Sequence, residues 1–233
     1  MIPKIIHQLW DSPEGKPVPI RFQILAETFK RLNPSWEYRL WGREEMQRLV
    51  EESYPDFLPT YNGFKENILR WDSIRYMILH HYGGLYADLD IECLKPLDGL
   101  FTDGYQMYIG EEPSTPSPYP WLRNVTGNGF MASVPGWAGW PLILQEIERA
   151  SKEYTEGRVV FNVTGVHMLT RMFQHLLPLG AHALPYELVS PVRKMDMYRY
   201  VYQCDTQLFR SRIGDAYCIH YFLGTWDKQL AIY

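Results

Sequence analysis

Two acidic residues separated by one apolar residue follow a pair of glycines near the middle of the chain. The glycines are Gly83 and Gly84, and the acidic residues are Asp88 and Asp90. In an extended segment, the two-residue side-chain period would place both carboxylates on the same side. Two like charges so close repel each other, and their simplest partner is a hard divalent cation that takes oxygen ligands. Glu92 continues the same face and could hydrogen-bond a metal-bound water.

A second charged pair lies within the mostly apolar segment 65–82, which is predicted to be a long helix ending at the glycine pair. Asp72 and Arg75 are three residues apart, so they share one face of this helix. Asp72 could accept hydrogen bonds from ribose hydroxyls while Arg75 neutralises a diphosphate, because a planar guanidinium suits phosphate. A simpler interpretation stays open for each motif. Asp72 and Arg75 could form only an intrahelical ion pair, and the two acids after the glycines could form only a solvated strand end.

Three further residues stand where predicted strands meet loops. Segment 2–10 is predicted to be a buried first strand, and Trp10 ends it, at the rim where open α/β sheets bind ligands. Its ring could stack on a nucleotide base or belong to the core. Asn128, between two glycines, could reach a sugar hydroxyl or serve a turn. His220 has apolar neighbours in a predicted strand, and such a histidine is more often a core residue than a ligand.

Helices are predicted where apolar residues recur at helical spacing, and strands where they alternate with polar ones. The predicted helices cover 20–32, a short stretch around 46–50, 65–82, 140–154 and a segment after 164–165 that runs through 176. The predicted strands cover 2–10, 36–40, 105–109, 126–134, 183–189 and 216–226. The helical spacing in the first helix is formed by Ile20, Ile24, Leu25, Phe29 and Leu32. The proline-rich segment 111–120 is predicted to be a surface loop: a passive one, a lid, or an element that contacts the acceptor of a reaction. Segment 191–212 has no readable pattern.

Composition and charge limit the classes of protein to which the chain can belong. With 233 residues, 46% of them hydrophobic, the chain suits one large domain with a sizeable core. The net charge of -4, without a basic block, argues against nucleic acid and anionic lipid as partners. Three widely spaced cysteines fit a reducing compartment, with Cys93 expected to be buried. No signal sequence or membrane-length apolar stretch is present, so a soluble cytosolic protein is expected and the sequons at Asn124 and Asn162 carry no meaning.

Together these motifs resemble glycosyltransferase family 32, the family of the yeast initiating α-mannosyltransferases, the inositol-phosphoceramide mannosyltransferases and many bacterial surface-polysaccharide enzymes. The matching stretches, in the family's order, are 2–10, 33–41, 71–76, 82–90 and 220–226. The most specific of them is the block from Asp72 to Asp90. The catalytic domain of the clostridial glucosylating toxins shares its Asp-x-x-Arg and Asp-x-Asp arrangement.

The resemblance implies an α/β fold of the GT-A type: a single Rossmann-like domain over residues 1–233, with a mostly parallel mixed central sheet flanked by helices. It implies a retaining, metal-dependent transferase that moves a hexose from a UDP- or GDP-sugar to a glycan or glycolipid acceptor, in polysaccharide or glycoconjugate synthesis. The expected cofactor is Mn²⁺ or Mg²⁺. The expected location is the cytoplasm, with a peripheral association at the inner face of the membrane.

The resemblance also assigns roles to individual residues. The expected catalytic residues are Asp88, Asp90 and Arg75, and the expected metal ligands are Asp88, Asp90 and His220. The residues that the resemblance implies for binding the nucleotide-sugar are Trp10, Asp72, Arg75, Thr225 and Trp226. Asn128 is added to this group because of its position between two glycines. Thr225 replaces the family's usual serine but keeps the hydroxyl. Val166, Trp137 and Gly139 also depart from the family's pattern, and they bear on acceptor contacts rather than on the metal site.

Two other functions compete with this one. A haloacid-dehalogenase-type phosphatase also uses Asp-x-Asp after a strand, but Glu92 stands where that motif needs Thr or Val. We reject it on that ground. A catalytically silent nucleotide-sugar or glycan-binding module is the alternative, with the aromatic residues as sugar platforms. Mn²⁺-dependent hydrolysis of a nucleotide-sugar would separate the two. No carboxylate can be named as a covalent nucleophile, so we expect a front-face route for the transferase.

Overall fold

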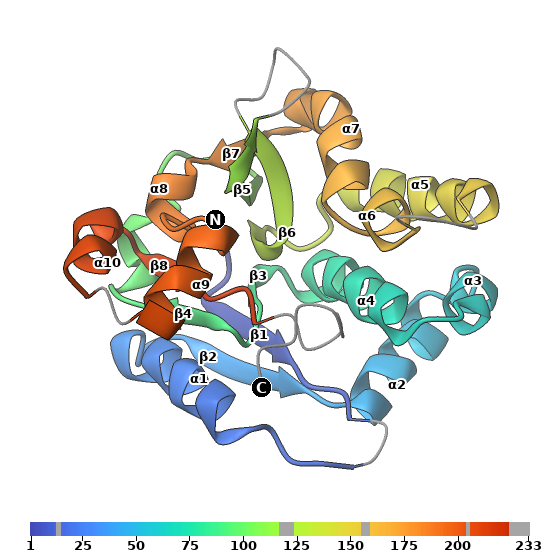
Figure 1. Ribbon diagram of the computed structural model, residues 1–233. Helices are drawn as coiled ribbons and strands as arrows, with labels where there is room; N and C mark the ends of the chain where they lie inside the picture. Colours follow the sequence, from blue (N-terminus) through green and yellow to red (C-terminus); the bar gives the residue numbers. More distant parts are fainter. Residues whose placement is uncertain (13–14, 117–123, 155–158, 204–205, 224–233) are drawn as a thin grey trace.

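The computed structural model describes residues 1–12, 15–116, 124–154, 159–203 and 206–223, and a six-stranded sheet runs through its centre (Figure 1). Along the sheet the order is β2-β1-β3-β6-β5-β7. These strands are β1 (Ile5–Leu9), β2 (Glu37–Trp41), β3 (Gly84–Ala87), β5 (Met107–Pro116), β6 (Asn124–Ser133) and β7 (Ala181–Leu184). A separate two-stranded sheet pairs β4 (Ile91–Cys93) with β8 (Cys218–His220).

The central sheet is mostly parallel, as predicted. Strand β1 runs parallel to β2 and β3, and β5 runs parallel to β7. Strand β6 is antiparallel to both of its neighbours, β3 and β5. The carboxyl ends of β1, β2, β3, β5 and β7 therefore lie along one edge of the sheet, where ligands of open α/β sheets bind.

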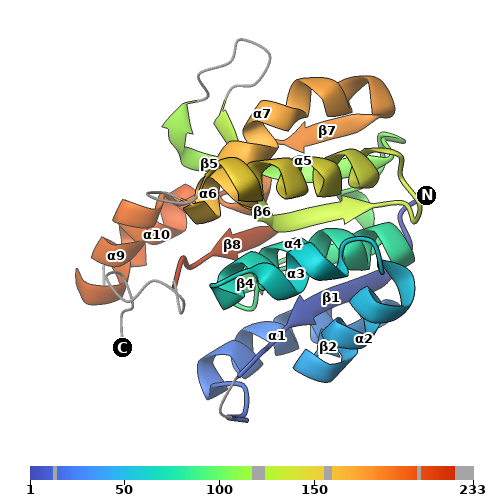
Figure 2. The same cartoon turned by 90° about the vertical axis from the view of Figure 1, so that its right-hand side faces the viewer.

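Helices cover both faces of the sheet and enclose two separate cores (Figures 1 and 2). The larger core lies under α2 (Arg43–Ser53), α3 (Leu58–Gly63), α4 (Asn67–Tyr82), α5 (Gly139–Glu153), α6 (Val159–Val163) and α7 (Val166–Leu176). The opposite face is covered by α1 (Ile20–Leu32) and α8 (Tyr186–Val189). Helices α9 (Lys194–Gln203) and α10 (Thr206–Ile213) pack beside β8. Two short 3₁₀ turns complete the elements, η1 (Leu97–Gly99) and η2 (Leu177–Leu179). In the part of the chain described, no helix combines the length and the apolar composition needed to cross a membrane.

The glycine pair turns the chain from α4 into β3. Gly83 caps α4 with a φ of 64°, and its N–H donates to Leu79 O at 2.9 Å. Gly84 has a φ of 90°, and a Cβ there would lie 2.5 Å from Ile5 O. Only glycine allows both this backbone conformation and the close approach of β3 to β1. The turn therefore fixes where β3 delivers the residues that follow it.

Several predictions about single elements are wrong. Ile20 and Ile24 of the predicted apolar face are 70% and 60% exposed; α1 buries Phe29, as predicted, but together with Phe22 and Ala26, which the prediction left out. Both sets have helical spacing and share Phe29, but the set that adds the aromatic ring of Phe22 buries more apolar area. Residues 111–116 continue β5 and are not a loop, whereas 117–120 lie outside the described residues.

Two further segments differ from prediction in the second half of the chain. Segment 183–189 is a strand only as far as Leu184, because Pro185 follows and begins α8. The unreadable segment 191–212 contains α9 and most of α10. Cys93 is buried in the core, as predicted, and opposes Cys218 across β4 and β8, with both thiols free.

Candidate active site

Asp88 and Asp90 lie in a tight turn directly after β3. The turn is closed by a hydrogen bond from Ile91 N–H to Asp88 O at 3.1 Å. The prediction of an extended segment with period-two side chains is therefore wrong here. The carboxylates converge all the same, because the turn brings them together with His220. One possible ligand atom from each of these three residues lies within 4.8 Å of the others.

His220 reaches this cluster from a distant part of the chain through strand pairing. In the β4–β8 sheet it is the register partner of Ile91. Its Nε2 lies 3.2 Å from Asp90 Oδ1, and Asp90 Oδ2 accepts a hydrogen bond from Leu223 N–H at 2.8 Å. His220 thus lies against the acidic pair and is not a core residue.

The three side chains shift one another's pKa values. Burial raises the pKa of Asp88, only partly offset by Arg75, and Asp90 raises it further. Burial acts the same way on Asp90, but the charge and hydrogen bond of His220 outweigh it and hold the pKa of Asp90 below its usual range. Burial lowers the pKa of His220, yet the charges of Asp90, Asp88 and Glu112 raise it on balance. The protein supplies negative charge here that favours a cation.

Arg75 joins the helix motif to the acidic turn. Its Nη2 lies 3.0 Å from Asp72 Oδ1, which confirms the intrahelical ion pair, and its Nη1 lies 3.3 Å from Asp88 Oδ1. Nη1 also donates to Asn128 O at 2.9 Å. Thr164 Oγ1 donates to Asp72 Oδ2 at 2.8 Å. Arg75 and Asp72 are only 5% and 4% exposed, so this is a buried network in which each charge is paired.

Other side chains that the sequence reasoning missed hold Asp88 in position. Tyr86 OH donates to Asp88 Oδ1 at 2.8 Å, and Gln8 Nε2 donates to Asp88 O at 3.2 Å. Gly129 O accepts from Asp88 N–H at 2.8 Å. A Cβ on Gly129 would lie 2.8 Å from Asp88 Oδ2, so this glycine makes room for the carboxylate. Gln8, a polar residue inside an otherwise apolar strand, was the available sequence signal.

Two other predicted site residues, Trp10 and Asn128, lie near backbone carbonyl groups. Trp10 directly follows β1 at the same sheet edge, where its Nε1 donates to Lys16 O at 3.0 Å. Asn128 Nδ2 lies 3.5 Å from Thr164 O. Glu92 accepts a hydrogen bond from Tyr221 OH at 2.6 Å and lies outside the metal-ligand group. Thr225 and Trp226 lie outside the described residues.

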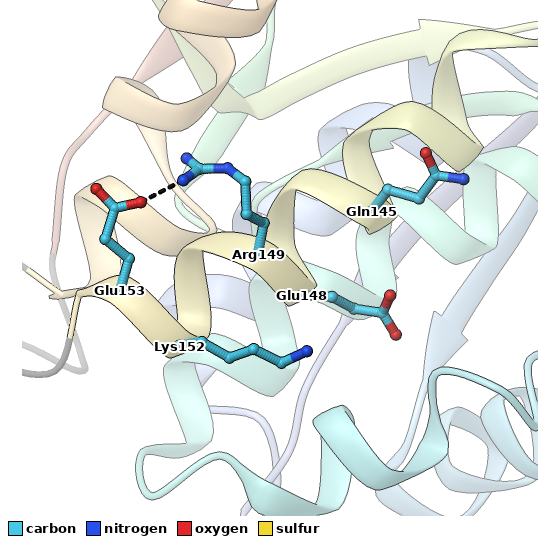
Figure 3. A pocket seen from close by; sticks show the side chains of 5 residues that line it. All are labelled: Gln145, Glu148, Arg149, Lys152 and Glu153. Atoms are coloured by element: carbon cyan, nitrogen blue, oxygen red, sulfur yellow. Dashed lines mark hydrogen bonds and ion pairs between the residues drawn. The ribbon is translucent and has the colours of Figure 1, made fainter.

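A surface hollow along α5 does not belong to this site (Figure 3). All the side chains that line it come from that one helix: Gln145, Glu148, Arg149, Lys152 and Glu153. Figure 3 shows Arg149 paired with Glu153, four residues further along the helix. Paired charges on an exposed helix face are typical of a solvated surface.

The sequence comparisons place the chain among known proteins. Residues 19–111 match the family model described as "Glycosyltransferase sugar-binding region containing DXD motif". Inositol phosphoceramide mannosyltransferase 2 of Schizosaccharomyces pombe is 36% identical over 159 residues, which are 66% of this chain and 41% of that protein. Inositol phosphoceramide mannosyltransferase 1 of the same organism is 32% identical over 179 residues, which are 74% of this chain and 51% of that protein. The chain thus spans about half or less of these relatives' length.

The structural comparison defines the fold. The UDP-bound glycosyltransferase domain of the YGT toxin superposes with a TM-score of 0.55 at 8% identity, covering 78% of this chain and 79% of that domain. The structural neighbours are glycosyltransferases with the GT-A fold, and this α/β chain has that fold. The resemblance to glycosyltransferase family 32 is confirmed, and the chain carries the DXD-containing sugar-binding region of these enzymes.

Proposed function

We propose that the chain is a retaining, metal-dependent glycosyltransferase that moves a hexose from a nucleotide-sugar to a glycan or glycolipid acceptor. The observation that carries this proposal is the convergence of Asp88, Asp90 and His220 beside Arg75 at the carboxyl edge of the sheet. Relatives named inositol phosphoceramide mannosyltransferases make a mannose donor and an inositol-phosphate glycolipid acceptor the first to test. A role in glycoconjugate synthesis and a cytoplasmic location stay predictions.

The donor atoms of the cluster fit a divalent cation. Two carboxylates and one imidazole offer atoms within 4.8 Å of one another, and this mixed oxygen and nitrogen set suits Mn²⁺, with Mg²⁺ as the alternative. We propose Asp88, Asp90 and His220 as the residues that would hold it. When bound, such an ion supplies positive charge that stabilises the departing nucleoside diphosphate.

Arg75 adds a second positive charge that the fold holds in place. Burial lowers the pKa of Arg75, but Asp88, Tyr86 and Asp72 raise it well above its usual range, so it stays charged. Because its N–H groups already bond Asp72, Asp88 and Asn128 O, we propose that it acts on the diphosphate chiefly through its charge. Preorganised groups of this kind are commonly worth about 3–4 kcal/mol each. Both oxygens of Asp72 are bonded, so its effect on the donor runs through Arg75.

The other predicted contacts with the donor complete the proposal. Trp10 would stack on the base and Asn128 would reach the sugar, with Thr225 and Trp226 beside the leaving phosphate. We propose a front-face reaction in which the leaving phosphate takes the acceptor's proton. A trapped glycosyl–enzyme adduct would exclude this route.

Turnover of nucleotide-sugars tests the proposed function. GDP-mannose, UDP-glucose, UDP-galactose and UDP-N-acetylhexosamines are incubated with the protein and Mn²⁺, Mg²⁺ or EDTA, and release of nucleoside diphosphate is measured. We expect release from at least one donor, dependent on metal, and a loss of at least about a hundredfold in Asp88→Asn and Asp90→Asn. Asp98→Asn is the matched control, because this exposed carboxylate pairs with Lys4, accepts a hydrogen bond from Trp36 Nε1 and lies outside the group that could hold a metal. Wild-type turnover in the first two variants would show that the site is misplaced, and metal-dependent binding without turnover would favour a silent binding module.

A further inference from the structure

A small recess lies beside the Asp88–Asp90–His220 cluster and has no role in the proposal above. Its lining includes His220, which belongs to the cluster, Gly129, which lies against Asp88, and also Glu112 and Ser190. The recess has room, about 20 Å³, for a single water-sized group. A hydroxyl group is of this size.

Ser190 brings an unpaired hydrogen-bonding group to the recess. The residue is 6% exposed, and among the described residues its Oγ is the buried side-chain oxygen that has no hydrogen-bond partner. Its backbone N–H is already used, donating to Tyr186 O at 2.7 Å. Buried hydroxyls are nearly always hydrogen-bonded, so this one indicates a partner that enters from the recess.

Glu112 brings a carboxylate to the same recess from β5. A Cβ on Gly127 of β6 would lie 2.7 Å from Glu112 Oε1, so the absence of a side chain at this position makes room for the carboxylate. Gly129, two residues on, does the same for Asp88. Glycines on one strand thus accommodate two acidic side chains, but Glu112 is outside the group that could hold a metal. Burial raises the pKa of Glu112, while the charges of His220 and Lys194 lower it and Asp88 raises it further.

We propose that Glu112 and Ser190 bind one hydroxyl of the hexose being transferred. A sugar hydroxyl both donates and accepts, so it can donate to the Glu112 carboxylate and accept from Ser190 Oγ–H. The hexose is attached to the diphosphate that the neighbouring cluster would hold, which places its ring next to His220 and Gly129. A hydrogen bond to a carboxylate is among the stronger ones, so this pair would select sugars that present a hydroxyl at that position. The inference rests on the proposed glycosyltransferase function and assigns one part of its donor site.

Binding of matched ligands tests the recess. Calorimetric titrations with Mn²⁺ compare GDP with GDP-mannose, and UDP with UDP-glucose, so that each pair differs only by the hexose. We expect Glu112→Gln to bind the nucleoside diphosphate as the wild type does but to lose roughly ten- to a hundredfold in affinity for the nucleotide-sugar. Ser190→Ala is expected to lose roughly two- to tenfold. Glu148→Gln, on the exposed face of α5, should change neither ligand's affinity.

Each other outcome has a defined meaning. If both variants keep the wild-type difference between nucleotide-sugar and nucleoside diphosphate, the proposal is overturned. Equal losses for both ligands would also overturn it, because they would mean a structural or metal-related role. A loss confined to transfer onto an acceptor would assign the recess to the acceptor instead and contradict the proposal. If the wild type binds neither ligand, the glycosyltransferase function itself fails and the inference fails with it.

Discussion

The guanidinium of Arg75 lies 3.3 Å from the carboxylate of Asp88, which joins the centre of α4 to the turn that follows β3. The same guanidinium pairs with Asp72 at 3.0 Å. One buried cation therefore balances the buried carboxylate of Asp72 and the partly buried carboxylate of Asp88. The acidic turn thus depends on a helix residue 13 positions earlier in the chain for its charge balance.

Removing the Arg75 charge should destabilise the fold. Arg75→Met leaves the buried Asp72 and the partly buried Asp88 without their shared partner, and we expect the free energy of unfolding to fall by about 3–5 kcal/mol. Urea titration followed by circular dichroism measures this. Arg149→Met is the control, because Arg149 is an exposed arginine that also pairs with two acids, and its loss should cost about 1 kcal/mol or less. Equal costs for the two variants would mean that the buried network contributes no more than a surface pair.

A methyl group at Gly129 should disturb the acidic turn selectively. Its Cβ would lie 2.8 Å from Asp88 Oδ2, so Gly129→Ala must displace that carboxylate. We expect Mn²⁺ affinity, measured by electron paramagnetic resonance of the free ion, to fall roughly tenfold or more, since one proposed ligand moves. Gly63→Ala is the control, because nothing lies within 4 Å of a Cβ at that exposed position. Unchanged Mn²⁺ binding in Gly129→Ala would argue against Asp88 as a ligand.

The buried histidine beneath the glycine pair should make stability depend on pH. His7 Nδ1 accepts from Trp41 Nε1 at 3.1 Å, and its Nε2 must donate to Gly83 O, 2.9 Å away, so the neutral ring is fully bonded. Burial lowers the pKa of His7 to about 4. Since the unfolded chain takes up this proton first, the stabilisation is complete above about pH 6.5 and is lost as the pH falls towards 4, by about 3 kcal/mol.

Comparison with a variant isolates this contribution from other titrating groups. His7→Gln should be less stable than the wild type at pH 7, and the difference in the free energy of unfolding should shrink by about 3 kcal/mol between pH 7 and pH 4. Urea titrations at several pH values measure it. A difference that stays constant with pH would mean that His7 titrates in the folded protein as it does in the unfolded chain.

The local sequence pattern predicts some of these structural features but not others. The helix around Asp72 and Arg75 and its glycine cap follow from apolar spacing and from the backbone freedom of glycine. Spacing cannot show that His220 meets Asp90, because their contact depends on the register of two short strands; the family resemblance supplied it. The inner face of α1 was misjudged because two apolar sets share its helical period.

The recess that contains Glu112 and Ser190 could not be predicted from the local sequence pattern at all. Glu112 lies in a segment whose prolines favoured a loop, and Ser190 follows a strand that gives way to a helix at Pro185. Neither residue belongs to a recognisable motif. Their juxtaposition comes from the pairing of β5 with β6 and β7, which is a tertiary property.

Crystals soaked with Mn²⁺ and GDP or UDP provide the most direct test of the central claim, through anomalous diffraction at the manganese edge. We expect one strong peak within bonding distance of Asp88, Asp90 and His220, and no such peak at this position in crystals of Asp90→Asn. An empty position between these three side chains in the wild type, or manganese bound only elsewhere, would contradict the account.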